Sequence, residues 1–234
     1  PHPSPARLRI LTVEIDNWTM EQALASVVDA AAGPTPRTFF FVNAHCLNIA
    51  HRRPDFRRAL AGAHAVFGDG VGLRMAGRLL RQPVRDNVNG TDLFPLLCAE
   101  ARRRDLSLFL LGARPGVAEE TARRAVERWP GLRIAGTQHG FFSPDEESRI
   151  RVRIAASGAH ILLVALGVPA QELWLERHSG SLGAGACLGV GGLFDFYSGR
   201  IRRAPLWMRR AGLEWCWRML QEPGRLAGRY LAGN

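Results

Sequence analysis

The stretch LFLLGARPGV, residues 108–117, shows in ten residues how this chain is built. Four apolar residues form a buried strand, Gly112 ends the strand in a turn, and a helix begins after Pro115. A buried strand followed at once by a helix is the unit from which parallel sheets are made. We therefore expect a parallel sheet if this unit repeats along the chain.

The unit does repeat along most of the 234 residues. Expected strands cover residues 8–15, 38–42, 63–67, 106–111, 132–136, 160–166 and 184–190. Expected helices cover residues 19–32, 44–61, 70–80, 91–103, 116–128, 144–157 and 169–178. Good N-cap residues mark several of these helix starts, namely Asp16 or Asn17, Thr91 and Ser143. The pattern predicts an α/β fold around a mostly parallel sheet.

Positive charge is concentrated near the C-terminus. The whole chain has a formal charge of +10 and contains no lysine. Residues 199–234 hold eight arginines against two glutamates, and Trp207, Trp215 and Trp217 lie among them. Such a segment suits phosphates or an anionic membrane, and it equally suits packing on its own domain or on a sister subunit. We expect an α/β domain over residues 1–199 and a helical appendage over residues 200–234.

The chain lacks the sequence signatures of several classes of protein. No apolar run is long enough to span a bilayer, and the N-terminus does not read as a signal peptide, so we expect a cytoplasmic chain. Cys46, Cys98, Cys187 and Cys216 are scattered without metal-ligand spacing and are expected to be reduced. A DxD motif is absent, as are HExxH and EF-hand patterns, so a bound metal is not expected.

Polar and glycine residues gather where the expected strands end, in loops beginning at residues 43, 68, 112, 139, 167 and 191. Ligands of open α/β sheets bind beyond the carboxyl ends of the strands. In FGDGVG, residues 67–72, Asp69 lies between two glycines. It is either a general base or sugar ligand, or the N-cap of the next helix.

Other motifs at these strand ends have both a binding and a structural interpretation. NGTDL holds Asn89, Thr91 and Asp92 at a helix start, where such residues also serve as ordinary turns and caps. Backbone groups near Gly112, and the glycines of GVGG, suit a phosphate or tight packing. Gln171 in GVPAQE suits a nucleobase or a sugar.

Taken together, these blocks resemble the WecG/TagA/CpsF glycosyltransferases (glycosyltransferase family 26). The similarity runs in order through ILTVEIDNWTMEQAL, FVNAHCLNIA, DGVG, NGTDL, FLLGARPGV, GFF, GVPAQE, GVGGLFDFYSG, RAP, GLEW and EPGR. It covers nearly the whole chain. The resemblance implies a Rossmann-like fold with helices on both faces of the sheet, and a C-terminal appendage that contacts the membrane and helps complete the active site.

The resemblance also implies an activity. It is the inverting transfer of a hexosyl or N-acetylhexosaminyl group from a UDP-sugar to a polyprenyl-diphosphate-linked saccharide. The product would serve exopolysaccharide, capsule or teichoic-acid-type synthesis at the cytoplasmic face of the bacterial inner membrane. No cofactor, metal or nucleic acid is expected, whereas an anionic membrane surface and a homo-oligomer are compatible with the family.

Site residues follow by motif. Asp69 is the implied catalytic base. Donor binding is implied for Asn43, Asn89, Thr91, Asp92, Gly112, Gln171, Gly191 and Gly192. Contact with the acceptor diphosphate or the membrane is implied for Arg202, Arg203, Arg218 and Arg225.

The chain departs from the commoner family pattern at three places. Phe41 replaces a threonine before Asn43, Asn87 replaces an arginine, and Ala170 replaces a lysine. These changes suggest a donor or acceptor different from that of the N-acetylmannosamine-transferring members, with UDP-glucose as one candidate donor. Two alternatives are a soluble UDP-sugar-modifying enzyme and a basic nucleic-acid-binding protein. Against the first, the chain lacks the GxGxxG motif that an epimerase would be expected to have. Against the second, the chain shows no RNP, KH or helix-turn-helix pattern.

Overall fold

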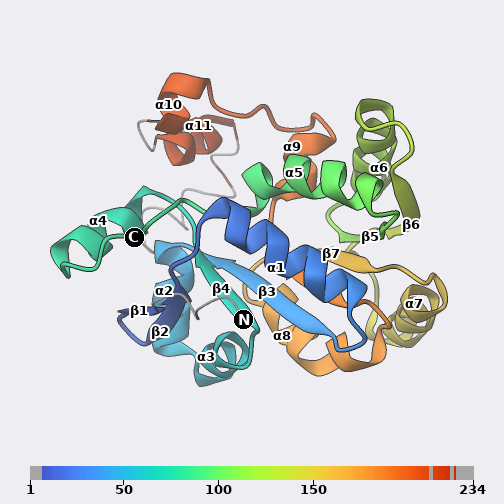
Figure 1. Ribbon diagram of the computed structural model, residues 1–234, viewed down its shortest axis with the longest axis horizontal. Coiled ribbons are helices and arrows are strands. Elements are labelled where there is room, and N and C mark those ends of the chain that lie inside the picture. The colour runs from blue at the N-terminus through green and yellow to red at the C-terminus, as the bar shows by residue number, and fades with distance from the viewer. Residues whose placement is uncertain (1–6, 211–212, 222–223, 225–234) are drawn as a thin grey trace.

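The fold is built on a six-stranded parallel sheet, seen in the computed structural model, which describes residues 7–210, 213–221 and 224 (Figure 1). The strands are β3 (Arg37–Val42), β4 (Ala65–Gly68), β5 (Ser107–Gly112), β6 (Arg133–Gln138), β7 (Ile161–Ala165) and β8 (Ala186–Gly189). They lie in the order β4-β3-β8-β7-β5-β6, and every neighbouring pair is parallel. The predicted α/β fold is confirmed.

The N-terminal segment differs from the prediction. Residues 8–15 do not form one strand but an antiparallel hairpin of β1 (Arg7–Ile10) and β2 (Val13–Asp16), separate from the main sheet. The buried residues are Leu8, Ile10, Val13 and Ile15, so their alternation changes phase between 10 and 13. A turn must fall at that point, since one strand cannot keep both halves on the same face.

Helices follow almost every strand. They are α1 (Met20–Ala32), α2 (Ala44–Arg52), α3 (Pro54–Ala61), α4 (Val71–Leu79), α5 (Gly90–Arg103), α6 (Val117–Arg128), α7 (Pro144–Ala156), α8 (Ala170–His178), α9 (Leu193–Tyr197), α10 (Leu206–Arg210) and α11 (Glu214–Gln221). A 3₁₀ turn covers Ser179–Ser181. The helix expected over 44–61 is two helices, because Pro54 forces Arg53 into an extended conformation.

Two expected N-caps lie elsewhere. Helix α1 is capped by Thr19 in a reciprocal pair with Gln22, instead of by Asp16 or Asn17. Helix α5 is capped by Asn89, whose side chain accepts from the amide of Asp92, instead of by Thr91. Helix α7 is capped by Ser143 as expected, in a capping box with Glu146.

Apolar cores fill both faces of the sheet. On one face the core includes Val27 of α1, Phe94 of α5 and Phe194 of α9. On the other it includes Leu47 of α2 and Trp174 of α8. Helices therefore cover both faces of the sheet, as expected for a Rossmann-like fold, and the carboxyl ends of the strands remain as the edge at which a site can form.

After α9 the chain leads to α10 and α11, which lie beyond α9 at the top of Figure 1. The backbone of Arg202 binds α11. Its amide donates to Gln221 Oε1 over 3.0 Å, and its carbonyl accepts from Trp217 Nε1 over 3.0 Å. Arg225 and the side chain of Trp215 lie outside the described residues.

Candidate active site

Strands β4, β3 and β8 are neighbours, so the loops that follow them meet at one edge of the sheet. Asn43, Asp69 and Gly191 lie in these three loops. The amide of Asp69 donates to the carbonyl of Val42 over 2.8 Å, which fixes the exit of β4 beside the exit of β3. The expected clustering of these loops is present.

Asp69 is held in a turn that leaves its carboxylate free of a capping role. Gly70, with φ at 97°, is the N-cap of α4, and no side chain caps this helix. The amide of Gly70 donates to Asn87 Oδ1 over 2.7 Å, so Asn87 fixes the turn directly after Asp69. The capping alternative for Asp69 is therefore wrong.

The pKa of Asp69 is raised from 3.8 to about 7, first by burial and then by the charges of Glu214 and Asp92. Arg218 and Arg203 act in the opposite direction. The residue keeps partial solvent access, although protein atoms surround its carboxylate on most sides. A carboxyl group with this pKa exchanges its proton near neutral pH.

Arg203 joins the start of α5 to α11. Its Nη1 donates to Asp92 Oδ1 over 2.5 Å, while Nε and Nη2 donate to the two carboxylate oxygens of Glu214 over 3.0 and 3.1 Å. Asn89 Nδ2 donates to the other oxygen of Asp92 over 2.8 Å. Burial alone would raise the pKa of Asp92, but the Asn89 and Arg203 hydrogen bonds lower it. Asp92 therefore stays ionised.

Arg218 lies against the glycine loop that follows β8. A Cβ atom at Gly192 would be 2.9 Å from Arg218 Nη2, so any larger residue would displace this guanidinium from its present position. The guanidinium carbon is also 5.0 Å from the centre of the Phe196 ring, and that of Arg203 is 5.8 Å from the same ring. The loop and two arginines from beyond residue 199 thus come together.

The buried side chain of Gln171 holds this loop through a hydrogen bond. It is only 1% exposed, its Oε1 accepts from the amide of Gly191 over 3.0 Å, and its Nε2 donates to Glu172 Oε1 over 2.9 Å. Gly191 has φ at 56° and open space where a Cβ would point. Gln171 holds the loop in place, and Gly191 is the residue that a ligand can approach.

The remaining predicted residues lie in different settings. Asn43 caps α2 by accepting from the amide of Cys46, the carbonyl of Thr91 accepts from the hydroxyl of Tyr197, and Arg202 is exposed. Gly112 lies at the end of β5, four strand positions from β4 or about 19 Å. A Cβ there would be 2.5 Å from the carbonyl of Ala165, so close packing of β5 on β7 accounts for this glycine.

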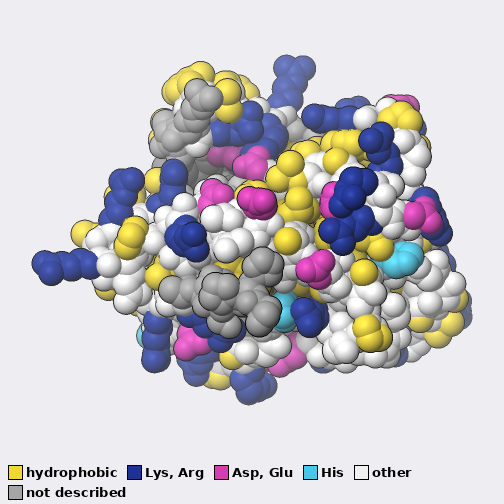
Figure 2. Space-filling view, viewed as in Figure 1, with side chains coloured by type: hydrophobic (Ala, Val, Ile, Leu, Met, Phe, Trp, Pro, Cys, Tyr) yellow, Lys and Arg dark blue, Asp and Glu magenta, His cyan; other side chains and the backbone are white. Residues whose placement is uncertain are grey.

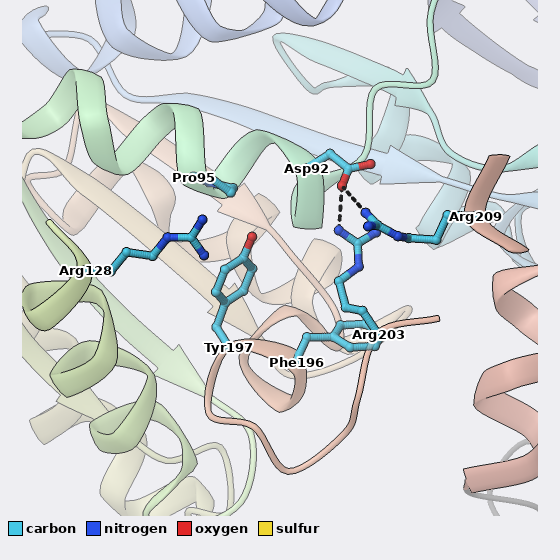
Figure 3. A pocket seen from close by; sticks show the side chains of 7 residues that line it. All are labelled: Asp92, Pro95, Arg128, Phe196, Tyr197, Arg203 and Arg209. Atoms are coloured by element: carbon cyan, nitrogen blue, oxygen red, sulfur yellow. Dashed lines mark hydrogen bonds and ion pairs between the residues drawn. The ribbon is translucent and has the colours of Figure 1, made fainter. Parts of the chain in front are cut away.

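A cavity of about 310 Å³ lies beside this cluster. Figure 3 shows the side chains that line it. Arg203 and Arg209 approach Asp92 on one side of it, and Arg128 lies on the other side of Tyr197. Its wall consists of Asp92, Pro95, Arg128, Phe196, Tyr197, Arg203 and Arg209. Burial raises the pKa of Tyr197 to about 12, so its hydroxyl remains protonated. In Figure 2 basic and apolar side chains gather together over α10 and α11.

Three residues of this cluster were not among the predicted site residues: Asn87 binds the turn after Asp69, the charge of Glu214 acts on Asp69, and the ring of Phe196 lies beside Arg218. Glu214 and Phe196 lie in the blocks GLEW and GVGGLFDFYSG that carry the family resemblance, and Asn87 is one of the departures from the family pattern, so the only signal for these residues was their place relative to those blocks. Across the described ranges, no three His, Cys, Asp or Glu side chains form a group that could hold a metal ion. No helix there is long and apolar enough to cross a bilayer.

A comparison with protein-family models matches residues 8–234 to the glycosyl transferase WecG/TagA/CpsF family. The matched region includes every element described above except the first residue of β1. This family acts in cell-surface polysaccharide synthesis, with a nucleotide-sugar donor and a saccharide acceptor. The chain, with its parallel sheet and its cluster of acids and arginines at the strand ends, belongs to the WecG/TagA/CpsF family of glycosyltransferases.

Proposed function

We propose that this chain is an inverting transferase that moves a sugar from a UDP-sugar to a polyprenyl-diphosphate-linked saccharide. One observation carries the proposal. Asp69, a carboxyl group with a pKa of about 7, lies at the end of β4 within the electrostatic reach of Arg203 and Arg218. A base and cations for a departing diphosphate are what such a transfer needs.

In the proposed reaction, Asp69 takes the proton of the acceptor hydroxyl. The hydroxyl oxygen forms a bond to the anomeric carbon of the donor sugar, and the bond from that carbon to UDP breaks on the opposite side. The configuration at the anomeric carbon is therefore inverted. A base with a pKa near the working pH is both ionised often enough and basic enough to accept this proton.

Negative charge that develops on UDP needs a counter-charge. The backbone around Gly191 is open to a ligand, and the Arg218 guanidinium lies on the adjacent Gly192. Together they form a cationic surface for a diphosphate, and no metal is required for this role. Added chelator should leave the rate unchanged, whereas a loss of rate restored by Mg²⁺ or Mn²⁺ would contradict a metal-independent reaction.

The division into a catalytic domain over 1–199 and an appendage over 200–234 belongs to the same proposal. Arg203, Glu214 and Arg218 all come from the second segment, and all three act on Asp69. Exposed Leu206 and Trp207 give α10 an apolar surface suited to the membrane interface. The appendage would thus complete the site while it contacts the inner face of the bacterial membrane.

The donor sugar is proposed to be a hexose such as glucose. Asn87 occupies the place where the commoner family pattern has an arginine, and its side chain is occupied by the amide of Gly70. A cation that could bind an N-acetylated sugar or its phosphate is therefore missing from this turn. A shift in donor preference is the expected consequence.

The experiment is a panel of UDP-sugars tested against polyprenyl-diphosphate-linked mono- and disaccharides. We expect transfer with one donor and inversion at its anomeric carbon, detected by NMR of the product. Interconversion of a UDP-sugar without any lipid acceptor would instead support the soluble sugar-nucleotide enzyme. Retention of configuration would contradict the single-displacement role of Asp69.

A further inference from the structure

Helix α4 has an outer face that the proposed function does not use. Its inner residues Leu73 and Gly77, four apart, are buried, and the helix packs toward β1. On the outer side Met75 is 58% exposed and Leu79 is 84% exposed. Side chains four apart lie on one face of a helix, so these two form an apolar ridge. The ridge is exposed to solvent. Helix α4 itself projects from one end of the molecule (Figure 1).

Positive charge runs alongside this ridge. Arg74 and Arg78 each precede a ridge residue by one position, and Arg81 follows directly after the helix. Residues 71–85 contain four arginines and no aspartate or glutamate. Arg74, Arg78 and Arg81 form no ion pair with any residue in the described ranges. In Figure 2 basic side chains project beside apolar ones at the end of the molecule where α4 lies.

We propose that α4 is a membrane-docking helix whose Met75 and Leu79 enter the headgroup boundary of an anionic bilayer. Arg74, Arg78 and Arg81 then bind lipid phosphates. A short amphipathic helix with cations beside its apolar face is the type of element that lies in a membrane interface. A second copy of this chain fits less well, because a symmetric contact through this face would bring arginines against arginines.

The position of α4 gives this contact a consequence. The helix begins two residues after Asp69, and the charges of Glu214 and Arg218 on α11 act on Asp69 from the appendage. Asp69 therefore lies next to the start of α4 and within the electrostatic reach of α11. Docking through α4 as well as through the appendage would fix the orientation of the site around Asp69 toward a lipid-linked acceptor. This consequence rests on the proposed function, whereas the docking itself does not require an acceptor.

Vesicle binding without any substrate tests the docking alone. The full chain is mixed with phosphatidylcholine vesicles that contain or lack phosphatidylglycerol, and the bound fraction is measured by flotation. We expect Met75→Gln/Leu79→Gln to weaken binding about tenfold. We expect Arg74→Gln/Arg78→Gln to weaken binding to the anionic vesicles by about tenfold or more. The control Val126→Gln/Val152→Gln, which removes two exposed apolar side chains from α6 and α7, should bind as the unaltered chain does.

A label at the ridge keeps the test valid if a double variant unfolds. In a Cys216→Ser background, Leu79→Cys and Val152→Cys are each coupled to a polarity-sensitive dye. Anionic vesicles should shift the emission to shorter wavelength at residue 79 but not at residue 152. The proposal is overturned if residue 79 shows no shift, or if both α4 variants bind like the unaltered chain. Unchanged vesicle binding with a change of oligomeric state would identify the face as a contact between copies, which also overturns it.

Discussion

At the scale of single residues, Asp69 makes the folded chain sensitive to pH. Its pKa is raised from 3.8 to about 7 in the folded state, so the folded form holds this proton more tightly than the unfolded form. The stability that this proton provides is complete below about pH 4 and is lost as the pH rises through about 7. We expect Asp69→Asn to raise the melting temperature at pH 8 relative to the unaltered chain.

The gain should be much smaller at pH 4, where Asp69 is neutral in the folded state and only partly ionised in the unfolded state, whose pKa is 3.8. Thermal unfolding followed by circular dichroism at both pH values measures the difference, and Asp145→Asn on the exposed start of α7 is the control. A melting temperature of Asp69→Asn that matches the unaltered chain at pH 8 would show that the carboxylate is not held in this environment.

The close approach of Arg218 to Gly192 leads to a second prediction at the scale of single residues. A methyl group there would be 2.9 Å from Arg218 Nη2, and the end of a flexible arginine can move away at little cost in stability. Gly192→Ala should therefore keep its melting temperature but lose activity, by roughly tenfold, because the displaced cation no longer faces the diphosphate. The matched control is Gly180→Ala, where nothing lies within 4 Å of the new methyl group. Equal activity of the two variants would show that Arg218 does not act on the diphosphate.

At the scale of elements, Arg203 couples α5 to α11 and lowers the pKa of Asp69. Without it, the charges of Asp92 and Glu214 act on Asp69 with less compensation. We expect Arg203→Gln to move the rise of kcat/KM to higher pH, whereas the exposed Arg202→Gln leaves the profile in place. A profile for Arg203→Gln that superimposes on that of the unaltered chain would separate this ion-pair network from Asp69.

Much of the element structure could be predicted, since buried strands and helix starts leave local signals. The hairpin was not predicted, although the sequence contains a signal for it. The signal is the change of phase in the alternation of apolar residues between Ile10 and Val13. Pro54 likewise marks the break between α2 and α3. The contact between Asp92 and Arg203 spans 111 residues and depends on tertiary packing, so no local pattern could reveal it.

The candidate site shows the same division. Asn43, Asp69 and Gly191 were predictable because the carboxyl ends of parallel strands share an edge. The packing role of Gly112 and the burial of Gln171 were not, because each depends on a neighbouring strand or loop that the sequence does not place. The functional roles of these residues stay predictions.

At the scale of the whole molecule, the described part of residues 200–234 places charges near Asp69 but contributes little to the apolar cores. Both cores lie within residues 1–199, and from the described part of the segment beyond only Ile201 and Ala204 are buried apolar residues. A chain that ends at Gly199 should fold and bind UDP within a few-fold of the full chain. It should transfer sugar about 100-fold more slowly, since Arg203 and Arg218 are gone.

Calorimetry with UDP and turnover with the lipid acceptor measure the two effects on the same preparation. A truncated chain that transfers sugar at the full rate would contradict completion of the site by the appendage. If the truncated chain does not fold, its cooperative melting transition will be absent. In that case Arg203→Gln and Arg218→Gln in the full chain test the loss of charge without the loss of folding.

The most direct measurement of the central claim is the dependence of kcat/KM on pH for the unaltered chain and for Asp69→Asn. We predict that the unaltered chain gains activity as the pH rises, with a midpoint near 7 where Asp69 loses its proton. Asp69→Asn should be slower by about 10² to 10⁴ and should lack this rise, with UDP binding retained. An Asp69→Asn variant that keeps the full rate, or that keeps the same rise near pH 7, would contradict the assignment of Asp69 as the base.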